Sequence, residues 1–224
     1  MEEIILPDNL HEVNLVNSSQ RILDNTLTKY KNLETCRQSM LDSFYLLCSC
    51  FSNGGKLLCC GNGGSASDCD HIVGELMKSF KKMRPISNAD SKKIEIIFEG
   101  ASQYLQKALP TINLASQTAL YTAYLNDCNP SMVYAQLTYG YARDYDVLLC
   151  ISTSGNSENI LAAAKVAKAI GIKVIGLTGQ NGGLLKAYCD VCIKVPEKET
   201  YLIQELHLPV YHTICAMLEE WMTE

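Results

Sequence analysis

Residues 56–76 read KLLCCGNGGSASDCDHIVGEL, and this stretch decides the fold class. The run Lys56–Cys60 is short and apolar, which is typical of a strand buried in a parallel sheet. A turn with three glycines and an asparagine follows it, and a helical pattern runs from Ala66 to Phe80. Glycines let a ligand approach the backbone closely, and the N–H groups at a helix start attract anions. The spacing is GxGG, so the loop alone also fits a plain strand-to-helix turn.

The remainder of the chain repeats this alternation of strand and helix. Short apolar runs predict four more strands, at Thr111–Ser116, Val147–Ile151, Lys173–Leu177 and Asp190–Val195. The clearest helical pattern between them covers Asn159–Ile170. Alternating strands and helices predict an α/β fold with a five-stranded parallel sheet flanked by helices.

Both ends of the chain are predicted to be helical. Leu10–Ser52 shows two helical segments, and the last helix is expected over Tyr201–Trp221. The stretch from Pro85 to Lys107 is polar, begins with proline and is weakly helical. Because no linker or repeat interrupts the pattern, we expect one domain over residues 1–224. It carries a helical N-terminal extension at 1–52 and an insertion at 85–109, which we expect to lie near the site as a cap over the substrate.

Composition excludes several classes of partner and compartment. The net charge is −5 and no Lys/Arg cluster exceeds two residues, which disfavours nucleic acid and anionic membranes as partners. No apolar stretch approaches the ~18 residues that predict a membrane span. The acidic N-terminus lacks a signal-peptide pattern, and eleven cysteines lie mostly in apolar runs. We therefore expect reduced, packed cysteines and a cytoplasmic protein. The Cys189–Cys192 pair lies in a predicted strand, without a second pair to complete a zinc ribbon.

A second loop, ISTSGNSEN at residues 151–159, also lies between a predicted strand and a predicted helix. Four hydroxyl groups surround its glycine, on Ser152, Thr153, Ser154 and Ser157. A helix cap needs one hydroxyl, whereas several hydroxyls beside free helix N–H groups make a phosphate cradle. In a parallel sheet both loops would lie at the carboxyl ends of strands, where ligands bind.

The ionisable candidates lie on two predicted helices. His71 and Glu75 are four residues apart and share a helix face, an arrangement that serves either a divalent metal or a structural pair. Gln204, His207 and His212 lie on the last helix. Gln204 and His212 are about 12 Å apart along its axis. Spacing alone does not select them as a pair of ligands.

Three motifs together resemble the SIS (sugar isomerase) domain family: GNGGSASDCDHIVGEL, ISTSGNSENILAAAKVAKAIGIKVIGLTG and ETYLIQELHLPVYHTICAMLEE. They occur in the family's order and cover about Cys36 to Glu220, apart from Ser87–Lys107. Within the family they look most like phosphoheptose isomerases. This resemblance implies a doubly wound SIS fold and a homotetramer with sites between subunits. It also implies isomerisation of sedoheptulose 7-phosphate to D-glycero-D-manno-heptose 7-phosphate through an enediolate.

The resemblance also implies roles for individual residues. Glu75 would be the base and His212 the second acid/base group. Zinc would be held by His71, Glu75, Gln204 and His212. The phosphorylated sugar would contact Asn62, Gly63, Gly64, Ser65, Asn126, Asp127, Ser152, Thr153, Ser154, Ser157 and Gln204.

The chain also departs from the family pattern. Gln117 stands where members commonly carry aspartate, Ser79 where they often carry arginine, and about twenty residues are added between Pro85 and Leu109. These departures leave two alternatives to the heptose isomerase open. One is an isomerase of a different sugar phosphate. The other is a non-catalytic SIS regulator that binds a sugar phosphate or associates with a replication initiator.

Overall fold

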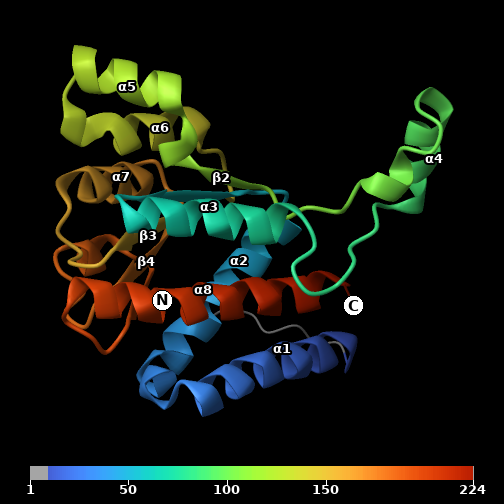
Figure 1. Ribbon diagram of the computed structural model, residues 1–224, viewed down its shortest axis with the longest axis horizontal. Coiled ribbons are helices and arrows are strands. Elements are labelled where there is room, and N and C mark those ends of the chain that lie inside the picture. The colour runs from blue at the N-terminus through green and yellow to red at the C-terminus, as the bar shows by residue number, and fades with distance from the viewer. Residues whose placement is uncertain (1–9, 224) are drawn as a thin grey trace.

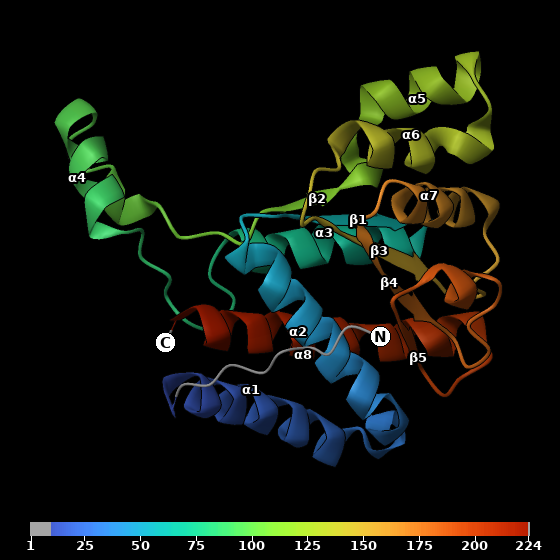
Figure 2. The same cartoon turned by 180° about the vertical axis from the view of Figure 1, so that it is seen from behind.

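The structure is a computed structural model that describes residues 10–223, with side chains from residue 18 onward. Its centre is a parallel sheet of five strands, in the order β2-β1-β3-β4-β5 (Figures 1 and 2). The strands are β1 (Leu57–Gly61), β2 (Thr111–Asn113), β3 (Val147–Ser152), β4 (Lys173–Thr178) and β5 (Val191–Lys194). All five expected strands are confirmed, and so is the α/β fold class.

The second strand is shorter than predicted. It ends at Asn113, because the Asn113 side chain accepts a hydrogen bond from the backbone N–H of Ala115 and starts a 3₁₀ turn at Leu114–Ser116. The helix after β1 is shorter too, since α3 covers Gly64–Met77 and does not reach Phe80.

Helices cover both faces of the sheet. One face carries α1 (Leu10–Lys29), α2 (Arg37–Ser52), α3 and α8 (Thr200–Thr223). The other carries α5 (Thr118–Asp127), α6 (Val133–Tyr141) and α7 (Glu158–Ala169). Short 3₁₀ segments occur at Lys31–Cys36, Ser102–Tyr104, Leu114–Ser116, Pro130–Met132 and Leu185–Tyr188.

The alternation of side chains along β1 divides the core between the two faces. Leu57 and Cys59 pack with α2, α3 and α8, whereas Leu58 and Cys60 pack with α6 and α7. All eleven cysteines are free thiols and seven are buried, as expected for small apolar core residues.

The N-terminal extension packs on the terminal helix. Figure 2 shows α1 lying along α8 at the outer edge of the molecule. The Ser19 hydroxyl donates to the Met217 carbonyl at 3.2 Å, and the hydroxyls of Thr26 and Thr213 are 2.8 Å apart. The first nine residues of the predicted extension lie outside the described range. Between residues 10 and 223, no helix is long and apolar enough to span a bilayer.

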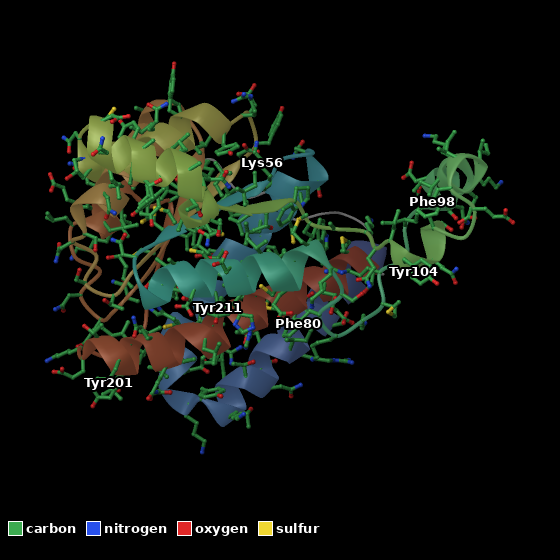
Figure 3. The ribbon with its side chains drawn as sticks, turned by 45° about the horizontal axis from the view of Figure 1, so that its top comes forward. Lys56, Phe80, Phe98, Tyr104, Tyr201 and Tyr211 are labelled. Carbon is green, nitrogen blue, oxygen red and sulfur yellow. The ribbon has the colours of Figure 1, made fainter. Side chains whose placement is uncertain are left out.

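The insertion forms an arm that projects from the body. Its ends meet at the base, where Pro85 pairs with Gln106 and the Lys107 N–H donates to the Arg84 carbonyl at 2.7 Å. Its helix α4 (Asn88–Ile97) has no buried residue. Phe98 and Tyr104 lie on the projecting part, 69% and 80% exposed (Figure 3). The base adjoins the C-terminal end of α3, while α4 points away from the sheet of its own chain.

Candidate active site

Two loops flank the point where the strand order reverses. From β1 the chain crosses to β2 on one side, and from β3 it crosses to β4 on the other. The carboxyl ends of β1 and β3 are therefore adjacent, and the crevice outside such a pair is where α/β sheets bind ligands. The glycine loop Gly61–Gly64 and the hydroxyl loop Ser152–Ser157 both emerge there, as predicted.

The glycine loop starts α3 and touches the terminal helix. Asn62, Gly63 and Gly64 are exposed, whereas Ser65 is buried. A Cβ atom on Gly64 would lie 2.9 Å from Nε2 of Gln204. Glycine at this position lets the Gln204 amide lie directly against the loop.

A pair of asparagine amides joins the glycine loop to the helix that follows the hydroxyl loop. Asn62 donates to Oδ1 of Asn159, and Asn159 donates back to Oδ1 of Asn62, both at 2.9 Å. Asn159 lies in the first turn of α7 and also accepts the N–H of Ile160 at 3.0 Å. Asn159 was not predicted as a site residue, although it directly follows the hydroxyl loop.

The hydroxyl loop folds back on itself over α7. The hydroxyls of Ser152 and Ser157 are 3.2 Å apart, although Ser157 precedes α7 and its hydroxyl makes no capping bond to that helix. Thr153 is half-buried and Ser154 is exposed. Gly155 has φ +64, and a Cβ there would lie 2.2 Å from the Gly182 carbonyl oxygen, so the tight loop needs glycine. The α7 N-terminus thus keeps donors for an anion.

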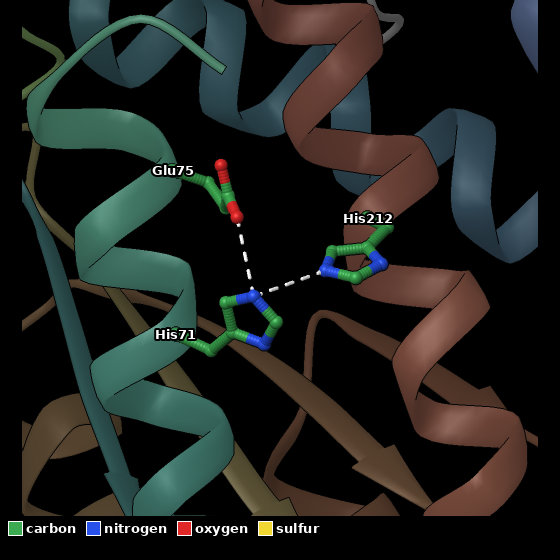
Figure 4. A group of neighbouring side chains, drawn as sticks. All are labelled: His71, Glu75 and His212. Atoms are coloured by element: carbon green, nitrogen blue, oxygen red, sulfur yellow. Dashed lines mark hydrogen bonds and ion pairs between the residues drawn. The ribbon is translucent and has the colours of Figure 1, made fainter. Parts of the chain in front are cut away.

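A cluster of three ionisable side chains lies between α3 and α8. Nε2 of His71 lies 3.2 Å from Oε1 of Glu75 and 3.4 Å from Nε2 of His212 (Figure 4). Ligand atoms of the three residues all lie within 4.8 Å of one another. The shared helix face of His71 and Glu75 was predicted, and α8 supplies His212 from 141 residues further along the chain.

Burial lowers the pKa of His212, and the nearby His71 ring lowers it further, while Glu75 opposes the shift. The three side chains also have the geometry of a metal site. When Nε2 of His71 carries no hydrogen, its lone pair is directed at the Glu75 carboxylate. Lone pairs facing one another at this distance favour a cation between them, either a proton or a metal ion. Two imidazoles and a carboxylate are ligands that zinc accepts.

Two further aromatic residues surround the cluster. The hydroxyl of Tyr211 is 3.0 Å from Nδ1 of His71 and donates to Oδ1 of Asp68 at 3.2 Å. The Phe80 ring lies 5.5 Å from the His212 ring. None of these contacts was predicted. The available signals were that Asp68 precedes His71 by one helical turn and that Tyr211 adjoins His212.

A buried ion pair fixes the end of α3 that carries Glu75. Nε of Arg84 lies 3.4 Å from Glu219, and both side chains are at most 2% exposed. Arg84 also donates to the carbonyls of Glu75 and Leu76 at 3.0 and 3.1 Å, which gives these carbonyls at the C-terminus of α3 hydrogen-bond partners. Glu219 accepts three consecutive backbone N–H groups, from Phe80, Lys81 and Lys82. This ion pair was not predicted from the sequence.

The remaining predicted residues lie apart from the cluster. Asn126 and Asp127 are exposed at the end of α5 and hydrogen-bond to each other at 2.8 Å. Because α5 packs on the sheet face opposite α3 and α8, Asn126 and Asp127 do not lie near the His71 cluster of the same chain. Gln117 accepts a bond from the Tyr141 hydroxyl, and Ser79 donates to Gln106 in the arm base.

Comparison with known proteins identifies the class. A family model described as the SIS domain matches residues 23–179, and the chain belongs to that family. Within it, the chain belongs to the phosphoheptose isomerases. It is 36% identical to the phosphoheptose isomerase of a Nitratiruptor species over 201 residues, 90% of this chain and 96% of that protein. Identity to the phosphoheptose isomerase of Aneurinibacillus thermoaerophilus is 39% over 76% of this chain and 75% of that one.

Solved structures of phosphoheptose isomerases have the same fold as this chain. The phosphoheptose isomerase GmhA from Neisseria gonorrhoeae superposes with a TM-score of 0.68 at 30% identity, covering 94% of this chain and 99% of that chain. A phosphoheptose isomerase from Francisella tularensis gives a TM-score of 0.71 at 28% identity, covering 91% and 97%. The resemblance seen in the three motifs is confirmed.

Proposed function

We propose that this protein converts sedoheptulose 7-phosphate into D-glycero-D-manno-heptose 7-phosphate. One observation carries the proposal: the cluster of His71, Glu75 and His212 lies between α3 and α8, and the glycine loop that starts α3 is hydrogen-bonded to Asn159, directly after the hydroxyl loop. A phosphate anchor beside an acid/base cluster is what an isomerase of phosphorylated sugars needs, and the chain belongs to such a family.

The chemistry moves a proton between adjacent carbons of the sugar. Glu75 takes the proton from one carbon and returns it to the next, and His212 moves the proton between the two oxygens. Ser152, Thr153, Ser154 and Ser157 hold the phosphate, so that binding energy far from the reacting carbons positions them. Asn62, Gly63, Gly64, Ser65 and Gln204 contact the sugar from the glycine loop and α8.

We further propose zinc as the metal. His71, Glu75 and His212 would hold it, with Gln204 on the same helix as His212 as a fourth ligand. When bound, zinc supplies Lewis-acid stabilisation of the negative charge that develops on the sugar oxygens. The mixed nitrogen and oxygen donor set supports this assignment.

We also propose a homotetramer with sites between subunits. Asn126 and Asp127 support it, because they are exposed and lie on the face of the sheet away from their own cluster. As substrate contacts, they would have to reach a neighbouring subunit's site. Sedimentation at micromolar concentration tests the assembly, and a monomer would contradict it. A reducing cytoplasm is the proposed location, in keeping with eleven free thiols.

The proposed reaction is tested by exchange of substrate protons with deuterated solvent, followed by NMR on ketose phosphates of five to seven carbons. Glu75→Gln keeps size and hydrogen bonding but removes the base, so turnover should fall about 10²-fold or more. Glu205→Gln, on the exposed side of α8, is the matched control and should keep the parent rate. A folded Glu75→Gln protein with the parent rate would show that Glu75 is not the base, and a parent that exchanges no substrate proton would favour the non-catalytic regulator instead. Preference for a ketose phosphate of five or six carbons would favour an isomerase of a different sugar phosphate.

A further inference from the structure

The side chain of Tyr211 links Asp68 to His71, the proposed zinc ligand, and neither takes or gives a proton in the proposed reaction. It lies on α8 one residue before His212 and is 3% exposed. Its hydroxyl donates to Oδ1 of Asp68 at 3.2 Å and lies 3.0 Å from Nδ1 of His71. The rings of Tyr211 and His71 meet edge to face, with centroids 5.7 Å apart. Asp68 and His71 both belong to α3, so Tyr211 reaches across from the opposing helix.

The direction of these hydrogen bonds constrains the His71 ring. A phenol has one hydrogen, and here it points to the Asp68 carboxylate. An ordinary phenol has a pKa of about 10, so at neutral pH the hydroxyl keeps that hydrogen. The Tyr211 oxygen can then only accept a bond from His71, which places a hydrogen on Nδ1.

A neutral histidine with hydrogen on Nδ1 has a lone pair on Nε2. This is the nitrogen that faces Glu75 and His212, at 3.2 and 3.4 Å. Histidines that bind metals generally donate their other ring N–H to a protein acceptor, which fixes both tautomer and ring orientation. The Tyr211 hydroxyl is in position to be that acceptor.

We infer that Tyr211, oriented by Asp68, is a positioning residue that holds His71 in the Nδ1–H tautomer and aims Nε2 at Glu75 and His212. This inference deepens the proposed function and rests on it for its catalytic meaning. The geometric part concerns the protein alone and can be measured without substrate.

Tyr211→Phe isolates the hydroxyl, because phenylalanine fills the same buried space. In the metal-free protein labelled with ¹⁵N-histidine, we expect the parent His71 to show hydrogen on Nδ1. In Tyr211→Phe we expect loss of that single tautomer. Zinc affinity, measured by calorimetry, should fall about 10- to 100-fold. Tyr201→Phe, an exposed tyrosine on the same helix, is the control and should change neither quantity.

A second variant guards against a folding defect. Asp68→Ala leaves the buried Tyr211 ring in place but removes the acceptor that orients its hydroxyl, so it should also release the His71 tautomer. If either folded variant keeps the parent tautomer and a zinc affinity within about twofold of the parent, the inference is wrong. Because the NMR readout needs no turnover, failure of the proposed function would show separately, as a Glu75→Gln protein with the parent rate.

Discussion

Asn62 and Asn159 exchange two hydrogen bonds of 2.9 Å and so join the loop after β1 to the helix after β3, across the crevice of the sheet. Asn62 belongs to the glycine loop and Asn159 to the first turn of α7. The pair therefore holds the predicted sugar-binding loop at a set distance from the predicted phosphate-binding loop.

Breaking this pair should weaken substrate binding more than catalysis. Asn62→Ala or Asn159→Ala should raise KM roughly three- to tenfold, the equivalent of one ordinary hydrogen-bond contribution. The double variant should be no worse than the worse single variant, because both remove the same contact. Steady-state kinetics on the four proteins measures this, with Asn53→Ala as an exposed control. Fully additive effects would show that the two amides act separately.

The hydroxyl loop should carry the phosphate affinity. Ser154→Ala and Ser157→Ala should each weaken binding of inorganic phosphate and of the sugar phosphate by about 10- to 100-fold, because hydrogen bonds to charged groups contribute about 1.5–3 kcal/mol. Thermal stability should change little, since Ser154 is exposed and Ser157 makes no capping bond. Isothermal calorimetry gives the affinities, with Ser52→Ala as the control. Unchanged affinity in both variants would show that the hydroxyl loop does not bind the phosphate.

The buried pair of Arg84 and Glu219 should be essential for stability. Glu219→Gln leaves Arg84 buried without its counter-charge, so the free energy of unfolding should fall by about 3–5 kcal/mol. Lys93→Met breaks only an exposed pair with Asp90 and should cost less than about 1 kcal/mol. Urea denaturation at fixed protein concentration compares the two. A Glu219→Gln protein within about 1 kcal/mol of the parent would contradict the role assigned to the pair.

His207 should make the fold sensitive to mild acid. It is fully buried, and neither ring nitrogen has a hydrogen-bond partner among the described residues. Burial lowers its pKa to about 4, although the nearby Thr178 backbone opposes the shift without forming a well-aligned bond. The unfolded chain takes up this proton near the ordinary pKa of about 6.5, whereas the folded protein does so only near 4. Stability should therefore fall as the pH falls from about 6.5 to 4, by about 3 kcal/mol from this group.

The test compares the parent with His207→Leu by urea denaturation at several pH values. Other groups also titrate in this range, so the difference between the two proteins isolates His207. The variant should lose less stability between about pH 7 and pH 5 than the parent. Equal slopes for both proteins would show that His207 does not titrate as its burial implies.

The arm is predicted to cap the substrate, and because α4 points away from the sheet of its own chain, in the proposed assembly it would cap the site of a neighbouring subunit. Because Pro85 and Gln106 already pair, residues 86–105 can be replaced by two glycines without moving the base. Folding should survive, since α4 buries no residue. The KM for sugar phosphates should change by about tenfold, or about 1.4 kcal/mol, and the preferred chain length of the sugar should shift. If KM and substrate range stay the same, the arm is not a cap.

The sequence by itself determined the elements and the chemistry that is local along the chain. Apolar runs and helical spacing located five strands and the helices between them, because the periodicity of apolar side chains is a property of consecutive residues. The same local logic placed His71 and Glu75 on one helix face and both loops at carboxyl ends of strands. Even there, the end of the second strand was wrong, at Ser116 instead of Asn113, because the Asn113 side chain forms a turn that periodicity does not register.

Only the tertiary structure decided which helix faces meet. His212 approaches His71, and Tyr211 reaches Asp68, because α8 packs against α3 from positions 141 and 143 residues further along the chain. No period in the sequence specifies that crossing, since many apolar faces could pack against the same sheet. The Arg84–Glu219 pair was not predicted for the same reason. The insertion at 85–109 was predicted, but its projection from the body was not. A charged residue in a polar stretch looks exposed until the fold supplies its partner and excludes water around it.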